Sequence, residues 1–402
     1  MSVNMPKIIF MVIILVTLTT QEDVASNMSD EDFSKISEDF GFKLFAQLSK
    51  SDEKKNVIFS PFSIQTSLAM ARMGAAGATA VDMDNGLGFP PVTEETLAEK
   101  YFEVLSPYTN SNVLKIANKI YVMKDYKVKA MYNELLQQKF ISQAENINFA
   151  ENDMAAKKIN SWVETKTNHL IQNLISPSML NNDTRLVILN AIHFKGEWLK
   201  KFAEFSTRDK DFYLDETNTV KVKMMHVKAS FRYGEYPELN ASALEMRYRN
   251  SDLSMLVLLP KSRTGLAKLQ KDLRSVSLNA LTRRMYTTEV IVDFPKFKAD
   301  FSIELSGVLK ELGMERIFSK EADFSNMLNS AERLAISKVI HKAFIEVNEK
   351  GTRATGSTMV NAYSARPRVP PPPKIFNADH GFYYFVRNAK GINVFQGSQV
   401  SF

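Results

Sequence analysis

The stretch between residues 349 and 374 constrains the fold of this chain more than any other feature. It lacks the apolar density of a core segment, and it closes with four consecutive prolines at 370–373. Proline-rich backbone is extended and lacks amide donors, so it cannot join the interior of a sheet. Loops of more than about 15 residues are uncommon inside a compact domain and are usually functional or disordered. We therefore expect an exposed loop here that carries the function.

The first half of this loop nevertheless alternates like a strand that is buried on one face. Successive strand residues point to opposite faces, which divides the segment into two columns. One column is small and uncharged, and consists of Thr352, Ala354, Gly356, Thr358, Val360 and Ala362. The other carries the charge and the bulk, and consists of Arg353, Thr355, Ser357, Met359, Asn361 and Tyr363. A flexible polar linker needs no such segregation, so we infer a loop that can become a central strand of a sheet.

The rest of the chain predicts one large α+β domain with mixed sheets. Apolar residues at three- and four-residue spacing predict helices at 30–50, 61–74, 94–105, 131–140, 153–174, 266–285 and 301–312. β-rich runs bounded by glycine, proline or charge predict strands at 56–59, 185–193, 253–259, 289–294, 335–347 and 394–400. No linker or internal repeat divides the chain, and this order of elements favours α+β over a regular βαβ array.

The N-terminus predicts secretion. Lys7 precedes an apolar run at 8–16 that polar residues follow. This order is that of a secretory signal peptide, because a membrane span needs roughly 20 apolar residues. We therefore expect a signal peptide at 1–25 and a single domain at 26–402. Three sequons then become glycosylation candidates, at Asn27, Asn182 and Asn240.

Composition excludes several kinds of site. The chain has no cysteine, so disulfides, zinc–thiolate centres and a cysteine nucleophile are impossible. A chain of this length can be stable without covalent bridges even outside the cell. The five histidines lack metal-ligand spacing, and we expect neither metal nor cofactor. The net charge of +6 is spread along the chain without a nucleic-acid motif, so we expect no nucleic-acid or membrane partner.

Four separated parts of the chain resemble the serpin family, in the same order and over essentially the whole mature sequence. Residues 56–64 (NVIFSPFSI) resemble its shutter segment, and 189–198 (LNAIHFKGEW) resemble its breach strand. Residues 343–352 (AFIEVNEKGT) resemble the strand and hinge that lead into its reactive loop. The C-terminal segments 382–386 (FYYFV) and 395–397 (FQG) resemble its core strands.

This resemblance implies three β-sheets with eight or nine helices in a metastable state, and a reactive loop at 349–374. In inhibitory serpins a target protease cleaves the loop and forms an acyl-enzyme, and the loop then inserts into the main sheet. The protease is carried across the molecule and distorted, and a misplacement of about 1 Å can slow deacylation on the order of 100-fold. The inhibitor is consumed as a substrate, so we expect no enzymatic activity and no catalytic residues.

The resemblance also implies roles for individual residues. The hinge consists of Glu349, Gly351, Thr352, Ala354 and Thr358, where glycine supplies backbone freedom and small side chains permit insertion without overpacking. Arg353 replaces the acidic residue usual in the family, but it lies in the outward column. A buried polar cluster at the shutter, with a packed tryptophan at the breach, is implied by Ser60, Ser63, Asn190, His341 and Trp198.

Two ways of counting place the scissile bond differently. Sixteen positions forward from Glu349 give Ala365–Arg366 and an elastase-like target. About eight positions back from Phe376 give Arg368–Val369 and a trypsin-like target. The counts disagree because this loop is some residues longer than is usual in the family. We prefer the first, since the length of the inserting strand governs trapping, and Tyr363–Ser364 stays open as a third candidate.

Two classes of function follow. The leading hypothesis is a secreted, monomeric suicide inhibitor of an extracellular serine protease, trypsin- or elastase-like, with a cysteine protease left open. The alternative is a non-inhibitory serpin, a binding, carrier or storage protein whose loop does not insert. A hydrolase built on Ser60 is a weak third class, because no Gly-x-Ser-x-Gly turn is present. The segment 94–108, where some serpins bind heparin-like polyanions, has Lys100 as its only basic residue, so we do not expect activation by heparin.

Overall fold

The computed structural model describes residues 28–50, 55–329, 333–350 and 371–402. The described residues form nine α-helices (α2–α10) and fourteen strands (β1–β14), which confirms the predicted α+β class. The predicted signal peptide and most of the expected reactive loop lie outside the described residues. No helix in the described part of the chain is long and apolar enough to cross a membrane.

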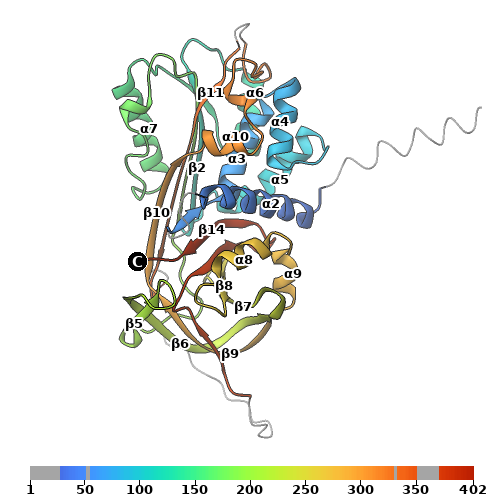
Figure 1. The fold of residues 1–402 in the computed structure, drawn as a ribbon. Helices are drawn as coiled ribbons and strands as arrows, with labels where there is room; N and C mark the ends of the chain where they lie inside the picture. The colour runs from blue at the N-terminus through green and yellow to red at the C-terminus, as the bar shows by residue number, and fades with distance from the viewer. Residues whose placement is uncertain (1–27, 51–54, 330–332, 351–370) are drawn as a thin grey trace, which may run out of the picture.

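A five-stranded sheet forms the upper half of the molecule (Figure 1). Its strands, in spatial order, are β10 (Phe297–Glu304), β11 (Ile336–Val347), β4 (Leu186–Phe194), β2 (Leu114–Met123) and β3 (Ala144–Ile147). Every residue of β4 is buried, as expected for a central strand that is covered on both faces. The two central strands, β11 and β4, run parallel.

Helices cover both faces of this sheet (Figure 1). One face carries α7 (Asn152–Lys166), and the other carries α3 (Pro61–Met73). Helix α3 is buried over almost its whole length, and its buried residues include four polar ones, Ser63, Gln65, Thr66 and Ser67. Ser60 caps this helix and Pro61 begins it, a start that suits the free amides of a first turn. Around α3 lie α2 (Asp30–Leu48), α4 (Gly77–Leu87), α5 (Glu94–Leu105), α6 (Ala130–Lys139) and α10 (Ser306–Glu311).

The remaining strands form one nine-stranded network below the first sheet. Its path is β1 (Val57–Phe59), β14 (Asn393–Gln399), β13 (Phe382–Arg387), β8 (Ser254–Pro260), β7 (Ala241–Arg247), β6 (Thr219–Tyr236), β9 (Tyr286–Pro295) and β12 (Lys374–Asn377), with β5 (Arg208–Tyr213) paired to β6. The resemblance implied three sheets, whereas hydrogen bonding joins the described strands into two networks. The reason is β6, whose 18 residues pair with β9 along one part and with β7 along the other.

Three predicted elements differ from the structure. The helix predicted at 153–174 ends at Lys166, because Asn168 and His169 adopt left-handed backbone with φ of 52° and 61°. The helix predicted at 301–312 begins as strand β10, which pairs with β11, and only its second part is helical. The segment 266–285 forms two short helices, α8 (Leu266–Leu273) and α9 (Leu278–Arg283).

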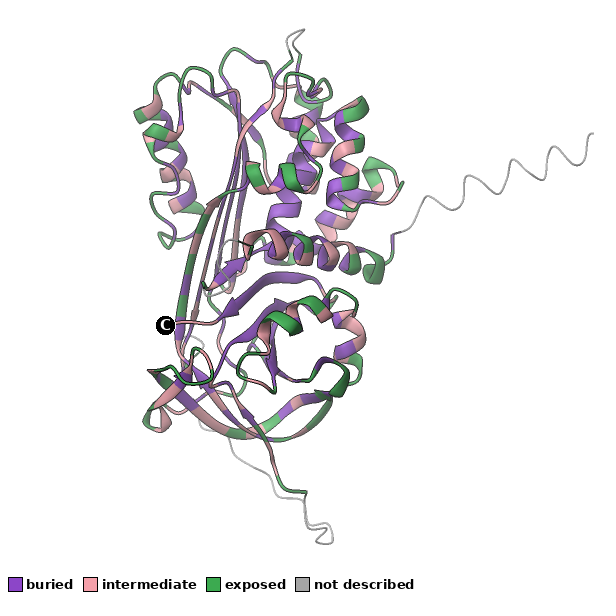
Figure 2. Ribbon diagram, in the orientation of Figure 1, coloured by how far each residue is buried: buried purple, intermediate pink, exposed green. Residues whose placement is uncertain are grey.

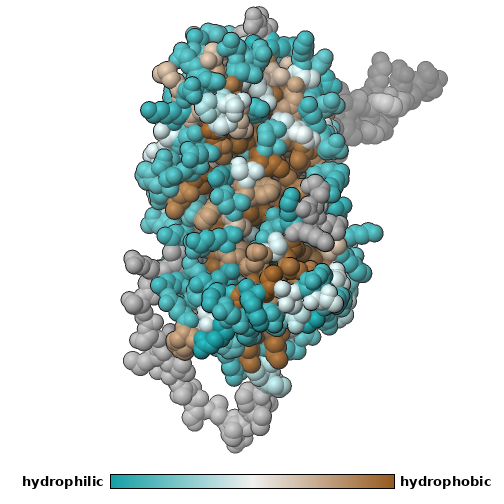
Figure 3. All heavy atoms as spheres, turned by 60° about the vertical axis from the view of Figure 1, so that its left-hand side comes forward, coloured by the Kyte–Doolittle hydropathy of each residue, from teal (hydrophilic) through white to brown (hydrophobic). Residues whose placement is uncertain are grey.

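The buried apolar residues of the described chain form two core clusters, and each cluster has members in both sheets. Figure 2 shows buried residues along the inner strands and along the sheet-facing sides of the helices. Figure 3, which turns the α7 side of the molecule forward, shows apolar residues gathered across the middle of that face. Where β11 and β4 meet, in the centre of the molecule, burial of a polar group without a partner costs the most free energy. Polar residues at this place are therefore the most informative about function.

Candidate functional site

Most of the described residues that the sequence singled out lie along the junction between β11 and β4. The two strands pair in parallel register from Ile336↔Leu186 to Ile345↔Phe194. Strand β11 ends at Val347 and leads directly to Glu349, the first residue of the expected reactive loop. The junction therefore lies immediately before the segment that the sequence predicts to move.

A buried polar cluster crosses this junction on the α3 side. His341 of β11 stands opposite Asn190 of β4, and its ring Nδ1 bonds the Asn190 side-chain oxygen. The Asn190 amide nitrogen donates to the Ser63 hydroxyl and to the side-chain oxygen of Asn118 on β2. The Ser63 hydroxyl donates to the same oxygen of Asn118 at 3.1 Å. Four elements are thus joined by side chains that are at most 7% exposed.

The capping residue of α3 completes the cluster. The backbone amide of Ser60 donates to His341 Nε2 at 3.2 Å, while the Ser60 hydroxyl accepts the amide of Ser63 at 3.1 Å. An accepting Nε2 leaves the imidazole neutral, with its proton on Nδ1 pointing at Asn190. Burial lowers the pKa of His341 from 6.5 to about 3, so the neutral form persists across the physiological range. The cluster is a hydrogen-bonded tie between strands, and Ser60 acts as a helix cap.

A second contact crosses the junction on the opposite face of the sheet. The rings of His193 on β4 and Phe344 on β11 stack with centroids 5.2 Å apart and an interplanar angle of 10°. The two residues are register partners. Burial, together with the charge of Lys195, lowers the pKa of His193 to about 4. Separation of the two strands would therefore break one contact on each face.

The far end of the junction is the breach, where Trp198 lies. Its indole nitrogen donates to the backbone carbonyl of Asn348 at 2.9 Å, and its ring stacks on Tyr248 at 4.4 Å. Trp198 is 1% exposed. It is therefore separate from the polar cluster, and it packs beneath the start of the expected hinge.

Glu349 is anchored at the same place. Its carboxylate accepts the Thr207 hydroxyl at 2.7 Å and pairs with Lys296 at 2.8 Å, while its backbone carbonyl accepts the amide of Phe202 at 3.2 Å. Burial alone raises the pKa of Glu349, but the bonds from Lys296 and Thr207 outweigh it and lower the pKa below the ordinary value. The hinge residue thus begins from a fixed, ionised position.

Loss of this anchor should destabilise the breach. Glu349→Gln removes the ion pair with Lys296 and is expected to lower the free energy of unfolding by about 1–2 kcal/mol, because the bond is charge-assisted and the carboxylate is buried. Glu346→Gln is the matched control. Glu346 also pairs with a lysine, Lys298, but the two side chains are 39% and 68% exposed, so a change below about 0.5 kcal/mol is expected. Urea unfolding of both variants makes the comparison, and equal losses would contradict the buried anchor.

The structure thus brings Ser60, Ser63, Asn190 and His341 together and places Trp198 and Glu349 at the breach. The other predicted hinge and scissile-bond residues lie outside the described residues, namely Gly351, Thr352, Ala354, Thr358, Ala365, Arg366, Arg368 and Val369. Asn182 and Asn240 are exposed, and Asn27 is outside the described part. No group of three or more metal-ligating side chains gathers within the described ranges.

Sequence reasoning missed three partners of these residues: Asn118, Thr207 and Lys296. The sequence around Asn118 contains a pattern that indicates a buried polar residue. It lies between Ile116 and Ile120 in the alternation of an otherwise apolar column, and a lone polar residue in such a column requires a buried partner. No sequence pattern marks Thr207 and Lys296, because only the packing of separate elements brings them to Glu349.

Comparison with known proteins agrees with this architecture. A family model described as Serpin (serine protease inhibitor) matches residues 35–401. Antitrypsin from Bombyx mori is 34% identical over 363 residues, which is 90% of this chain and 92% of that protein. The structure of cleaved Serpin 42Da has a TM-score of 0.84 at 43% identity and covers 92% of this chain and 98% of its own. Human thyroxine-binding globulin has a TM-score of 0.80 at 27% identity, covering 92% and 98%.

The sequence led us to expect a protease inhibitor without enzymatic activity of its own. The family description and the name antitrypsin describe inhibition of a protease. Because the family model covers residues 35–401 and a relative of 34% identity covers 90% of the chain, this protein belongs to the serpin family.

Proposed function

We propose that this protein is a secreted suicide inhibitor of an extracellular serine protease, and that it acts by inserting its cleaved loop between β11 and β4. The observation that carries the proposal is the parallel pairing of these two strands. A strand that follows β11 through a tight turn runs antiparallel to β11, and hence antiparallel to β4 as well. The strand order therefore leaves a position that the segment after Glu349 can fill.

Insertion at this position is energetically favourable for a simple reason. One parallel ladder would be replaced by two antiparallel ladders, and parallel pairing is slightly less stable per residue. The small column from Thr352 to Ala362 would face the buried α3 side, while Arg353 and its neighbours would face outward. The sheet without the inserted loop is then the less stable arrangement, as the metastable state of an inhibitory serpin requires.

The contacts at the junction supply the barrier that keeps the loop out. Insertion requires separation of His341 from Asn190 and of Phe344 from His193, and it also passes the anchor at Glu349. These contacts lie on both faces of the sheet and at its breach end. Cleavage of the loop would release the remaining constraint, which is the tether to β12 on the nine-stranded network.

The target and compartment follow from the sequence. Ala365–Arg366 is the preferred scissile bond, with an elastase-like protease as target, and Arg368–Val369 with a trypsin-like protease is the alternative. The signal peptide at 1–25 would direct secretion. The exposed positions of Asn182 and Asn240 are compatible with glycan attachment.

Incubation with trypsin-, chymotrypsin- and elastase-like proteases tests the proposal. We expect a covalent complex that survives denaturing gels, and release of a C-terminal peptide whose mass identifies the scissile bond. Loop-cleaved protein should also unfold at a higher temperature than intact protein, because the sheet has gained a strand. Cleavage without a complex and without thermal stabilisation would refute the inhibitor.

A second candidate function has one observation in its favour. Thyroxine-binding globulin, a solved relative, is named for binding thyroxine, and a binding or carrier serpin needs no insertion. The same experiment separates the two candidates. A carrier is cleaved without complex formation, whereas the small, uncharged column from Thr352 to Ala362 favours the inhibitor.

A further inference from the structure

A cavity of about 590 Å³ lies between the nine-stranded network and the start of α2. Its floor comes from β6, β7, β8 and β13, and its walls come from the first turn of α2, from α9 and from the turn at 388–391. Figure 1 shows the start of α2 above α9, beside these strands. The volume falls in the range of sites for small organic molecules, which is about 300–1,000 Å³. None of the described residues that line it belongs to the polar cluster or the breach.

Strand register places two arginines on either side of one serine in the floor. Arg247 of β7 is the cross-strand partner of Ser254 on β8, and Ser254 is in turn the partner of Arg387 on β13. Directly opposed residues of antiparallel strands point to the same face of the sheet. All three line the cavity. Since neighbouring strands lie about 5 Å apart, the backbones of the two arginines are separated by about 10 Å, a span that two long side chains can close around one anion.

Both arginines keep donors that no protein group occupies. Within the described residues the exposed Arg247 side chain has no hydrogen bond and no ion pair. Arg387 donates through Nε to Asn393 at 2.8 Å. Its Nη2 donates to Asn279 at 2.6 Å and to the carbonyl of Gly391 at 2.8 Å, but its Nη1 has no partner in the described part of the chain. The Arg387 side chain is only 5% exposed, and a buried charged donor without a partner is costly.

The acidic residues of the cavity leave these two arginines uncompensated. Three of them are paired with other basic groups: Glu245 with Arg232, Asp30 with Lys390, and Glu31 with Arg283. Glu245 also accepts the Ser254 hydroxyl at 2.8 Å, which fixes this carboxylate on the floor. The positive charges that remain for a ligand are therefore those of Arg247 and Arg387.

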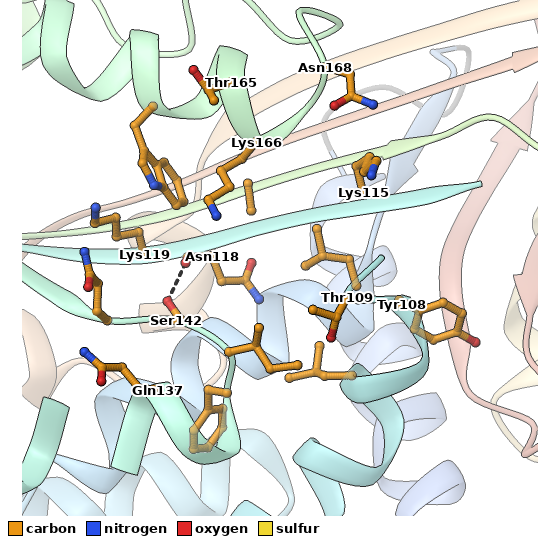
Figure 4. Close-up of a pocket in the computed structure, with 17 residues that line it drawn as sticks. Tyr108, Thr109, Lys115, Asn118, Lys119, Gln137, Ser142, Thr165, Lys166 and Asn168 are labelled. Atoms are coloured by element: carbon orange, nitrogen blue, oxygen red, sulfur yellow. Dashed lines mark hydrogen bonds between the residues drawn. The ribbon is translucent and has the colours of Figure 1, made fainter. Parts of the chain in front are cut away.

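The fourth acidic residue, Asp252, is held at the rim by Tyr108. Figure 4 shows a different cavity, at the edge of β2, with Tyr108 at its margin and the hydroxyl pointing away from the other labelled residues. That hydroxyl is 2.9 Å and 3.1 Å from the two carboxylate oxygens of Asp252. Asp252 is exposed, so its charge is largely screened by water. It would still repel an anion in the cavity, and its removal therefore provides a test.

Glu38 lies outside the cavity lining and compensates Arg387 only in part. Its carboxylate is 3.8 Å from the guanidinium, and it also accepts the amide of Leu278 at 3.0 Å. Burial lowers the pKa of Arg387, because desolvation outweighs the attraction of Glu38 and Glu245. An anion on the cavity side would supply the charge that the protein does not.

We propose that this cavity binds a phosphate group, free or carried by a small polar molecule, between Arg247 and Arg387. A guanidinium presents paired N–H donors that match the oxygens of phosphate in bidentate geometry. Apart from Leu256, Ala389 and Gly391, the lining residues are polar or charged. Such walls suit a hydroxylated body such as a sugar better than an aromatic one. The site does not depend on the proposed inhibition of a protease.

Titration calorimetry of the full chain with inorganic phosphate and with glucose 6-phosphate tests the site. We expect saturable binding of both probes and none of glucose. Tighter binding of glucose 6-phosphate than of inorganic phosphate would identify a phosphorylated small molecule as the ligand, and equal affinities would identify the free ion. Arg247→Gln should weaken the binding of both probes at least about tenfold, because a charge-assisted bidentate contact is lost.

Three matched variants separate binding from a general loss of structure or charge. Arg249→Gln removes an exposed arginine of the same hairpin outside the cavity and should change the affinity less than about twofold. Arg247→Lys keeps the charge without the planar fork, so it should restore part of the affinity. Asp252→Asn removes a repulsive charge and can still accept the Tyr108 hydroxyl. It should tighten binding about two- to fivefold, which no damage to the fold would produce.

Thermal unfolding without ligand should give the same midpoint for Arg247→Gln and the parent, because the Arg247 side chain has no partner within the described residues to lose. Absence of saturable binding with both phosphate probes would overturn the proposal. Equal weakening by Arg247→Gln and Arg249→Gln would overturn it as well, since binding would then follow net charge and not this cavity. Covalent complex formation with proteases is a separate measurement, so its failure would refute the inhibitor and leave the phosphate site.

Discussion

If the proposed inhibition is correct, replacement of Ala354 by arginine is expected to turn the inhibitor into a substrate. Ala354 belongs to the small column, which would face the buried side of the sheet after the proposed insertion. A guanidinium there would be buried without a partner, at a cost of about 3–5 kcal/mol. Since each 1.4 kcal/mol is tenfold, the trapped fraction should fall at least about 100-fold. Denaturing gels that compare covalent complex with cleaved protein measure this fraction.

Arg353→Glu is the matched control for this result. It changes a charge at the neighbouring position, but in the column that would face outward, so trapping should be retained. Ala354→Ser tests the effect of side-chain size at this position, and this variant should also trap the protease. Trapping by Ala354→Arg at the level of the parent would contradict insertion of this column, even if the protease recognises the loop.

His341→Gln is expected to flatten the dependence of stability on pH. The pKa of His341 is about 3 in the folded protein against 6.5 ordinarily. Below pH 6.5 the unfolded chain therefore binds a proton that the folded protein does not, so acid favours unfolding. This destabilisation of the folded protein by His341 is absent above pH 6.5. It grows by about 1.4 kcal/mol for each pH unit down to about pH 3. Between pH 6 and pH 4 it amounts to about 3 kcal/mol.

Urea unfolding at several pH values measures this slope. The glutamine variant should be less stable than the parent at pH 7, because the tie to Asn190 is weakened, but its stability should fall less steeply toward pH 4. His193 should retain its own contribution down to about pH 4. His169→Gln is the control for the loss of an exposed histidine, because the His169 side chain is 75% exposed. A parent-like slope in His341→Gln would show that this histidine is not the buried neutral base.

The sequence predicted the residues of the polar cluster better than it predicted their partners. Ser60, Ser63, Asn190 and His341 stand in recognisable segments, and each is a polar residue in an apolar context. Asn118 belongs to the same network, and it was missed because strand β2 was not assigned. The apolar column of Leu114, Ile116, Ile120 and Val122 around Asn118 alternates as in a strand, so this partner could have been found from the sequence.

The contacts that hold Glu349 illustrate a different limit of prediction from the sequence. The sequence indicated a hinge residue, but Lys296 and Thr207 are distant from it in the chain and carry no pattern of their own. Likewise, the helix predicted at 301–312 begins as a strand because β11 supplies an edge for β10 to pair with. Tertiary pairing overrides local propensity where a strand partner is available.

The sequence by itself determined the α+β class, most of the helices and the two-column pattern of residues 352–363, because these depend on periodicity and on side-chain size within short segments. The tertiary structure alone decided that β11 and β4 are parallel neighbours, that Asn118 completes the buried cluster and that Lys296 and Thr207 hold Glu349. Each of these depends on groups far apart in the chain, and the free energy that brings them together comes from burial of the whole core.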